Sequence, residues 1–460
     1  MLSLKNIDKL EYANKQKKKI ERELPYFITI VTLLATSGLG PYFIFQKIRE
    51  FNLLPTIRAE SEKILKRIDL LGVDPLTAMS QAKDKPSSKA LGEFLGGYVS
   101  SMQSGGNVIN YLKSKMNSVF DRYAETEKQS ISKVQALIEA YMTIQVVVLA
   151  LYIMVTSIGP TMNIGLSPSS GFKPDYILLI LSPVVSAGFL FMSRGISHSK
   201  VKEIEIKKIV KFAAPSFGIV TTLMITGIFS NIIGSGYILA VAFIASSLWP
   251  ALRFKKIYAT SLDAESATPQ ILRDITESRK AGIGPEKCVI HACKRSDYKL
   301  FNPVTSAIAT KLEWGIPLQN IFETLEKEIK NFQVLINFRI LIEVISSGGG
   351  SVQTLDALAD TSEKFYNVDK NKRDMLKPYV MVGFMLIGIT SFTTLIVIDS
   401  FSNISQQSEI DEAKQAQLRK DSQSTLDLFS IAIVIQAWLA GLFLGKITTG
   451  SFSGGFMYSI

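Results

Sequence analysis

The chain alternates between long uncharged apolar runs and stretches rich in charged side chains. A helix needs roughly 20 predominantly apolar residues to cross about 30 Å of hydrocarbon at 1.5 Å per residue. The uncharged run 212–252 is too long for one crossing and contains a turn signal at 231–236, so it predicts a hairpin of two spans. We therefore predict about six transmembrane helices: two within 141–193, two within 212–252, one at 378–398 and one at 428–446.

Basic side chains are concentrated in the loops that this pattern places on one side of the membrane. The loop 194–211 has six Lys or Arg side chains against two acidic ones, whereas the stretch 399–427 has three basic and six acidic ones. Because Lys and Arg mark cytoplasmic loops, we expect both termini and the basic loop 194–211 in the cytoplasm. The stretch 399–427 is then an external acidic loop.

Two long charged regions, 1–140 and 253–377, are also expected in the cytoplasm. Their apolar residues recur at spacings of three and four, as in Ile64, Leu65 and Ile68, which predicts amphipathic helices. The first region carries 21 basic and 15 acidic side chains and the second carries 19 and 16, so both are net basic. The fold class predicted is all-α: a polytopic membrane protein with two cytoplasmic helical-bundle domains.

Composition supports a membrane protein. The 460 residues are 47% hydrophobic with a formal net charge of +11, and the mean hydropathy is +0.23. Soluble domains usually have a mean hydropathy below zero, and this apolar fraction excludes disorder over most of the chain. The two cysteines, Cys288 and Cys293, are too few for a disulfide framework and are expected to be reduced.

A constant offset relates the two charged regions. Each region also contains a similar segment between its early and late glycines. Leu71-Gly72-Val73-Asp74-Pro75-Leu76 in the first region resembles Trp314-Gly315-Ile316-Pro317-Leu318 in the second, with one residue deleted. At an offset of 244 residues, the matched pairs are Pro25 with Pro269, Gly38 with Gly282, Gly40 with Gly284, Pro41 with Pro285, Gly105 with Gly349 and Gly106 with Gly350. One offset that persists through Gly and Pro positions over about 80 residues indicates one helical module encoded twice.

The residue types of the repeat predict helix ends. We expect Pro25 and Pro269 in the first turn of a helix, where the missing N–H costs nothing. Gly38 and Gly282 then end that helix in the left-handed conformation, and the following Gly-Pro starts the next one. The later Gly-Gly pairs predict another tight connection between helices. These residues are expected to shape the backbone rather than to bind a partner.

The run Glu23-Leu24-Pro25-Tyr26-Phe27, followed by Gly38-Leu39-Gly40-Pro41, resembles the opening of the type II secretion system F domain. The resemblance covers about residues 20–160 and 265–400, both copies of the module and the spans after them. Proteins of this family are inner-membrane platforms of type II secretion systems, type IV pili, tight-adherence pili and archaella. The extra hydrophobic hairpin within 212–252 resembles the archaeal members, which assemble archaella or archaeal type IV pili.

The resemblance implies a non-enzymatic coupling role. A cytoplasmic hexameric secretion ATPase would bind the modules, and the spans would move pilin or archaellin subunits into a filament. Membrane lipids and a second copy of the chain, in a homodimer or small oligomer, are further implied partners. Basic side chains beside the membrane are candidate contacts for the ATPase or anionic lipid: Lys15, Lys17, Lys18, Lys19 and Arg22, and Arg194, Lys200, Lys202, Lys207, Lys208 and Lys211. Their ordinary roles, a solvated helix face and the positive-inside rule, stay open.

A search for catalytic chemistry gives no site. The chain has no phosphate-binding G-x-x-x-x-G-K-[ST] loop, so ATP hydrolysis would have to come from a partner. Cys288, His291 and Cys293 lie close together but lack a fourth ligand at zinc-like spacing. We expect neither a metal nor another cofactor. Nucleic-acid binding is not expected either, because no aromatic residues are interleaved with the basic ones.

Two other classes of protein compete with a platform. A secondary transporter or channel is often built from repeats, but the uncharged runs that predict the six spans contain no Asp, Glu, Lys, Arg or His; the last of these runs, 428–445, ends just before Lys446. A membrane receptor or adaptor would carry a folded domain outside, and the largest external stretch is 399–427. We expect the two modules to pack as a pseudo-symmetric pair beneath the membrane and to form the seat of the ATPase.

These patterns together predict ten segments along the chain. They are a basic segment 1–22, module 1 at 23–140, spans 141–193, a basic loop 194–211, a hairpin 212–252, module 2 at 253–377, a span 378–398, an external loop 399–427, a span 428–446 and a cytoplasmic tail 447–460.

Overall fold

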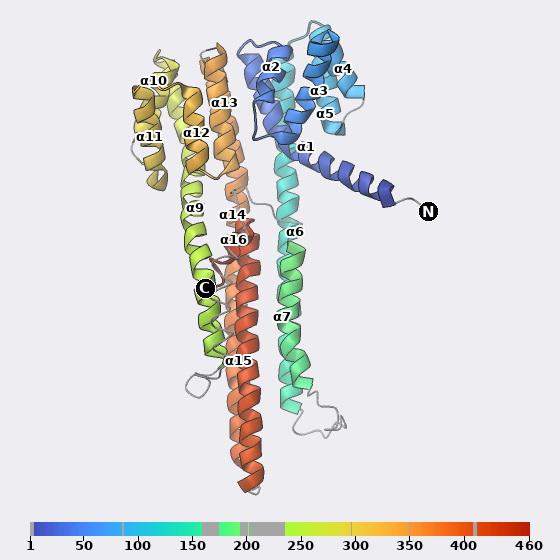
Figure 1. Cartoon of the computed structure of the whole chain (residues 1–460), viewed down its shortest axis with the longest axis vertical. Coiled ribbons are helices and arrows are strands. Elements are labelled where there is room, and N and C mark those ends of the chain that lie inside the picture. Colours follow the sequence, from blue (N-terminus) through green and yellow to red (C-terminus); the bar gives the residue numbers. More distant parts are fainter. Residues whose placement is uncertain are drawn as a thin grey trace. The chain divides into compact units, whose positions relative to one another are not determined.

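The computed structural model describes residues 4–84, 87–158, 174–193, 201, 235–295, 297–348, 350–407 and 412–460, and their regular elements are helices (Figure 1). The all-α fold class is thus confirmed. The helices are α1 Leu4–Thr36, α2 Pro41–Arg49, α3 Pro55–Leu71, α4 Pro75–Asp84, α5 Lys89–Gln103, α6 Val108–Ile158, α7 Pro174–Met192, α9 Ser235–Lys280, α10 Pro285–Lys294, η2 Lys299–Phe301, α11 Asn302–Glu313, α12 Leu318–Glu328, α13 Phe332–Gly348, α14 Val352–Gln407, α15 Glu412–Thr449 and α16 Phe452–Gly455.

The chain forms two compact units, and each contains segments that are far apart in sequence. Unit 1 consists of Met1–Glu127 and Ala259–Lys370, and unit 2 consists of Lys128–Tyr258 and Asn371–Ile460. Both copies of the repeat therefore contribute to unit 1. The helices α6, α9 and α14 each begin in one unit and end in the other.

The repeat appears in unit 1 as two sets of helices in the same order. The first set runs from the end of α1 through α2, α3, α4 and α5 to α6, and the second from the end of α9 through α10, α11, α12 and α13 to α14. Matching helices begin at the offset seen in the sequence: α2 at Pro41 and α10 at Pro285, then α6 at Val108 and α14 at Val352.

The glycine turns of the two sets have the same geometry. Gly38 and Gly282 have φ of 92° and 82°, in the left-handed region that an L side chain enters only with strain. After each of them the next residue bonds back across the helix end, Leu39 N–H to Leu34 O at 3.1 Å and Ile283 N–H to Ser278 O at 3.3 Å. This six-to-one bond satisfies a carbonyl at the end of the helix.

The position of the two prolines differs from the expectation of a first helical turn. Pro25 lies in the interior of α1, which begins at Leu4, and Pro269 lies in the interior of α9. An interior proline loses one backbone hydrogen bond and costs about 3 kcal/mol. In α1, burial on both sides of Pro25 offsets this cost, because Leu24 is 4% exposed and Tyr26 is 4% exposed. The polar segment upstream is rich in Lys and Glu, which favour helix.

The prediction of multiple membrane spans is supported by helix length and composition. Four of the described helices are long and apolar enough to cross a bilayer, within the segments Val108–Leu151, Gly236–Lys280, Val352–Thr393 and Ser430–Thr449. The second predicted span corresponds to α7, whose described apolar part is Leu181–Met192. The first span of the 212–252 hairpin lies outside the described residues.

A buried polar cluster in unit 2 fixes the directions of its helices. Gln145 of α6 donates to Ser186 Oγ at 3.0 Å and accepts from Ser182 Oγ at 2.9 Å, both on α7. Gln436 of α15 donates to the same Gln145 at 3.0 Å, and Tyr141 lies 3.2 Å from Ser186 Oγ. Tyr141 contacts Ser186, whereas Gln145, one turn later in α6, also contacts Ser182, one turn earlier in α7. The two helices are therefore antiparallel. Interhelical hydrogen bonds of this kind hold membrane helices together.

The stretch 399–427 is not the simple loop that its charge suggested. The helix α14 continues to Gln407 and α15 begins at Glu412, so most of the stretch is helical. The start of α15, 412–420, consists of Glu, Ala, Lys, Gln, Leu and Arg, which are good helix formers even where no apolar face is available. Absence of hydrophobic residues ends a membrane span, but it does not end a helix.

Gly282→Val should destabilise unit 1. A β-branched residue is strained at φ of 82°, so we expect a cost of about 1–2 kcal/mol and faster hydrogen exchange at the start of α10. The thermal unfolding midpoint of the detergent-solubilised chain and amide exchange measure this.

Gly284→Val is the matched control. Gly284 has φ of −59° and ψ of 146°, a conformation that valine adopts readily, and a Cβ atom there meets no atom within 4 Å. Equal loss of stability in both variants would show that the turn at Gly282 is not held by its backbone conformation.

Candidate partner-binding unit and its internal interface

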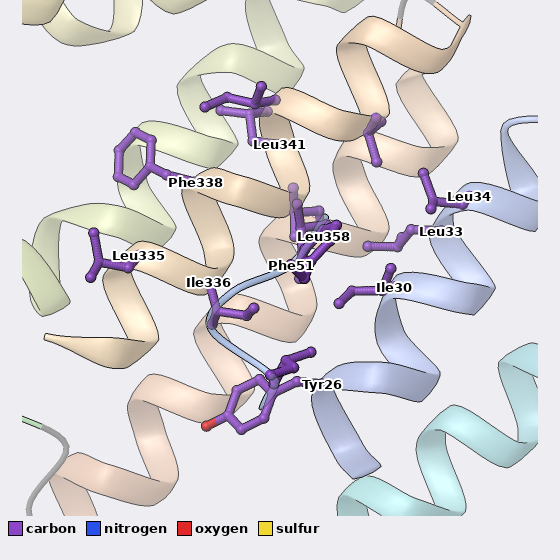
Figure 2. Close-up of a cluster of buried hydrophobic side chains, with 14 of the residues drawn as sticks. Tyr26, Ile30, Leu33, Leu34, Phe51, Leu335, Ile336, Phe338, Leu341 and Leu358 are labelled. Carbon is purple, nitrogen blue, oxygen red and sulfur yellow. The ribbon is translucent and has the colours of Figure 1, made fainter. Parts of the chain in front are cut away.

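The two modules share one hydrophobic core in unit 1. Helix α1 of the first module packs against α13 and α14 of the second, with Ile30, Leu33 and Ile336 among the buried side chains (Figure 2). Tyr26 of α1 stacks on Phe365 of α14, with ring centroids 4.7 Å apart, and meets Phe332 edge-on at 5.1 Å. Aromatic pairs of this geometry add about 0.5–1.5 kcal/mol each to the burial of their area. The modules are therefore halves of one folded body.

A charged cluster lies at the edge of this interface. Lys47 of α2 forms an ion pair of 2.8 Å with Glu343 of α13, whose side chain is 5% exposed. Arg339 of α13 lies 3.5 Å from Glu343 and 3.6 Å from Glu50, and its guanidinium stands 5.3 Å from the centre of the Phe51 ring. Two cations flank one buried carboxylate, so the negative charge of Glu343 is compensated. The cluster fixes the register between the modules.

One contact between the modules joins residues that are equivalent in the repeat. Phe120 of α6 and Lys364 of α14 occupy equivalent positions of the repeat, and Lys364 Nζ lies 5.7 Å from the Phe120 ring centre. Contact between equivalent residues is the mark of a local two-fold relation. Tyr26 breaks this relation, because its equivalent Gln270 is exposed. The expected pseudo-symmetric pair is therefore present at α6 and α14 but not at the α1 interface.

Glu23 links α1 to the start of α3. Its carboxylate accepts hydrogen bonds from Ile57 N–H at 2.8 Å and Thr56 N–H at 3.0 Å, which are unpaired donors at a helix N-terminus. Burial raises the pKa of Glu23, and these two backbone bonds oppose the rise. The residue therefore joins two helices of the first module.

The predicted basic contact residues fall into two groups. Lys15, Lys17, Lys18, Lys19 and Arg22 are exposed on α1, and Lys15 forms an ion pair with Glu11 at 2.6 Å. This part of α1 thus presents a basic, solvated face. The second group, Arg194, Lys200, Lys202, Lys207, Lys208 and Lys211, lies outside the described residues.

Cys288, His291 and Cys293 do not converge in the structure. Both cysteines are buried in α10, whereas His291 points to solvent. Burial raises the pKa of the Cys293 thiol to about 12, so it stays protonated at neutral pH. Among the described residues, no group of three His, Cys, Asp or Glu side chains is placed to hold a metal ion.

The sequence patterns missed the residues of the internal interface. Arg339 and Glu343 are the only charged residues in the apolar helix α13, and they are four positions apart. This isolated pair was the available signal for a buried charge cluster. Its partners Lys47 and Glu50 come from the other module and carry no comparable signal.

Comparison with known proteins identifies the family. A profile described as type II secretion system protein F matches the chain twice, over residues 27–156 and 271–398, and the two matches begin at the offset of the repeat. These matches cover more than half of the chain, which therefore belongs to this family. It is a multi-pass membrane protein of the platform type found in secretion and pilus systems, a type whose members are non-catalytic.

One similar curated protein comes from Methanocaldococcus jannaschii. It is described as the uncharacterized protein MJ1286 and is 21% identical over 431 residues, which cover 84% of this chain and 70% of that protein. No solved structure matches the chain.

Glu343→Gln should weaken the interface between the modules. The substitution leaves Lys47 and Arg339 without their shared negative charge, so we expect a loss of about 1–3 kcal/mol in the stability of unit 1. Chemical denaturation of the solubilised chain measures it.

Glu363→Gln serves as the comparison. Glu363 pairs with Arg273 at 2.8 Å, but its side chain is 50% exposed, and exposed ion pairs stabilise a protein by about 0–1 kcal/mol. If both variants lose the same stability, the Glu343 cluster does not hold the modules together.

Proposed function

We propose that this protein is the membrane platform of an archaellum or archaeal type IV pilus assembly machine. In this role it couples a cytoplasmic hexameric secretion ATPase to the insertion of pilin or archaellin subunits into the filament. Chemical energy enters at the modules, and the membrane-spanning helices act on the subunits. The chain contributes binding surfaces and mechanical connection, and the ATPase contributes hydrolysis.

One observation carries this proposal. The helices α6, α9 and α14 run without interruption between the segments of unit 1 and the apolar segments of unit 2. Helix α6 contains no proline, so displacement of its charged half is transmitted to its apolar half. Helices α9 and α14 contain Pro250 and Pro378 near the same boundary, where a backbone hydrogen bond is lost and the helix bends more easily. A hinge between the modules and the spans would dissipate such a movement.

The archaeal assignment has separate support. The similar protein MJ1286 comes from Methanocaldococcus jannaschii, and the predicted hairpin at 212–252 matches the pattern of archaeal members. A transporter is less well supported, because the buried polar cluster of Gln145 consists of uncharged side chains that hydrogen-bond one another. Coupled transport of ions normally requires ionisable groups near the middle of the spans, whereas Lys446, which is buried, lies near the end of the apolar segment Ser430–Thr449.

Deletion of the gene should abolish one surface filament, and the tagged chain should co-purify with a secretion ATPase from detergent extracts. Loss of swimming would indicate an archaellum, and loss of surface attachment alone would indicate an adhesive pilus. As a control, a plasmid copy of the gene should restore the filament. Intact filaments in the deletion strain, together with no ATPase in the purified sample, would rule out the proposed role.

The proposed orientation places both modules and both termini in the cytoplasm. Lys18→Cys in α1 and Leu300→Cys in the second module introduce thiols at exposed positions, whereas the native cysteines are buried. We expect a membrane-impermeant maleimide to label neither variant in intact cells and both in inverted vesicles. Labelling of the two positions from opposite sides would contradict the orientation, and the unmodified chain gives the background.

A further inference from the structure

Each module of unit 1 exposes large apolar side chains at the same turn of the repeat. Leu70 and Leu71, at the end of α3, are 76% and 72% exposed, and Trp314, just after α11, is 77% exposed. Leu71 and Trp314 are equivalent residues, and each precedes a left-handed glycine, Gly72 or Gly315. We call these three apolar residues the tip residues.

The tip residues lie at one end of unit 1. Tyr42 at the start of α2 donates to Asp69 Oδ1 at 3.1 Å, which places the end of α3 beside the start of α2. In the second module, Gln319 at the start of α12 donates to Ser346 Oγ at 2.8 Å, near the end of α13. A Cβ atom at Gly348, at the end of α13, would lie 3.3 Å from Ser37 O, just after α1, so the ends of α1 and α13 meet and both tips lie at this end of unit 1.

Single exposed apolar residues are common on protein surfaces and need no explanation. Here a large apolar residue is exposed at the same position of both modules, because Leu71 aligns with Trp314. The sequences of the two modules have otherwise diverged. Two further large apolar residues, Phe43 and Ile109, are exposed at the same end, at 56% and 37%. Clustered apolar exposure in a water-facing domain is typical of interaction sites.

The tips are pre-organised for binding. Gly72 and Gly315 have φ of 64° and 75°, and each turn is closed by a backbone bond, Val73 N–H to Arg67 O and Ile316 N–H to Lys311 O. A side chain held on a fixed turn loses little backbone entropy when it is bound. Trp is also among the residues that most often dominate binding energy at interfaces.

The repetition indicates what covers the tips. Two equivalent protrusions on one chain match a partner that presents one socket more than once, which is the property of a homo-oligomer. Charged residues of both signs flank the tips, Asp69 and Asp74 beside Leu71 and Lys311 and Glu313 before Trp314, so the apolar side chains are what distinguishes this surface.

A bilayer is a less suitable occupant. Ile109, at the same end as the tips, is separated along α6 from the uncharged segment that begins after Glu139 by roughly 30 residues, or about 45 Å of helix.

We propose that Leu70 and Leu71 on one module and Trp314 on the other are paired anchors for the ring-shaped secretion ATPase. Each inserts into an apolar socket, and the two sockets belong to different subunits of the ring. This inference rests on the proposed function and adds to it the surface through which the ATPase is bound. Simultaneous engagement of two anchors raises the apparent affinity above that of either one.

The test uses the full chain in detergent and the purified secretion ATPase of the same organism, with binding measured by interferometry at fixed salt. We expect Trp314→Ser, and separately Leu70→Ser with Leu71→Ser, to weaken binding about tenfold each. All three substitutions together should weaken it by about a hundredfold or more. Exposed positions tolerate serine, and unchanged thermal unfolding midpoints verify this for each variant.

Leu300→Ser is the matched control. Leu300 is a 54% exposed apolar residue of unit 1, but it lies beside Asp263, well before the end of α9 and away from the tips. We expect its substitution to leave the affinity unchanged. If the ATPase binds the original chain and the tip variants equally, the tips are not the docking surface, while the proposed function stands.

Failure of the original chain to bind the ATPase would overturn the proposed function and the anchors with it. Insertion of Trp314 into lipid is tested by quenching with brominated lipid in a reconstituted variant carrying Trp249→Phe and Trp438→Phe, since the chain has three tryptophans. We expect no quenching of Trp314. Strong quenching would show that a bilayer covers this tip and would overturn the docking proposal.

Discussion

The burial of α1 between the helices of both modules is the interaction on which unit 1 depends. Tyr26 and its apolar neighbours in α1 are buried partly against α13 and α14 (Figure 2). Removal of this area from water is the main source of stability in such a body. The interface also explains why Pro25 is tolerated inside a helix, because the burial of its neighbours exceeds the cost of one lost hydrogen bond.

Sharing one core makes the two modules a single mechanical element. A partner that displaces one module displaces the other, and α6, α9 and α14 continue from this element into the apolar segments. The charged cluster around Glu343 adds specificity to the apolar contact, since a shifted register would leave a carboxylate buried without its cations. The coupling role proposed above would make use of this combination of a shared core and helices that continue into the apolar segments.

Gene duplication supplied two copies of one fold, and the structure uses them differently. Position 26 is a buried tyrosine in the first copy, whereas its equivalent, Gln270, is exposed in the second. The shared glycine turns preserve the path of each module, while substitutions on the helix faces decide what each face contacts. The exposed residues at Leu71 and Trp314 are the case in which divergence kept the apolar character.

The sequence by itself determined the helical class, the repeat, the glycine turns and most of the membrane spans. These features are local: left-handed glycines, helical periodicity and the length of uncharged runs act within a few turns of chain. It could not reveal that Pro25 is inside a helix, that α14 continues to Gln407, or that Lys47 meets Glu343. Those features were decided by the tertiary structure, because they depend on which surfaces are buried together, and residues almost 300 positions apart supply them.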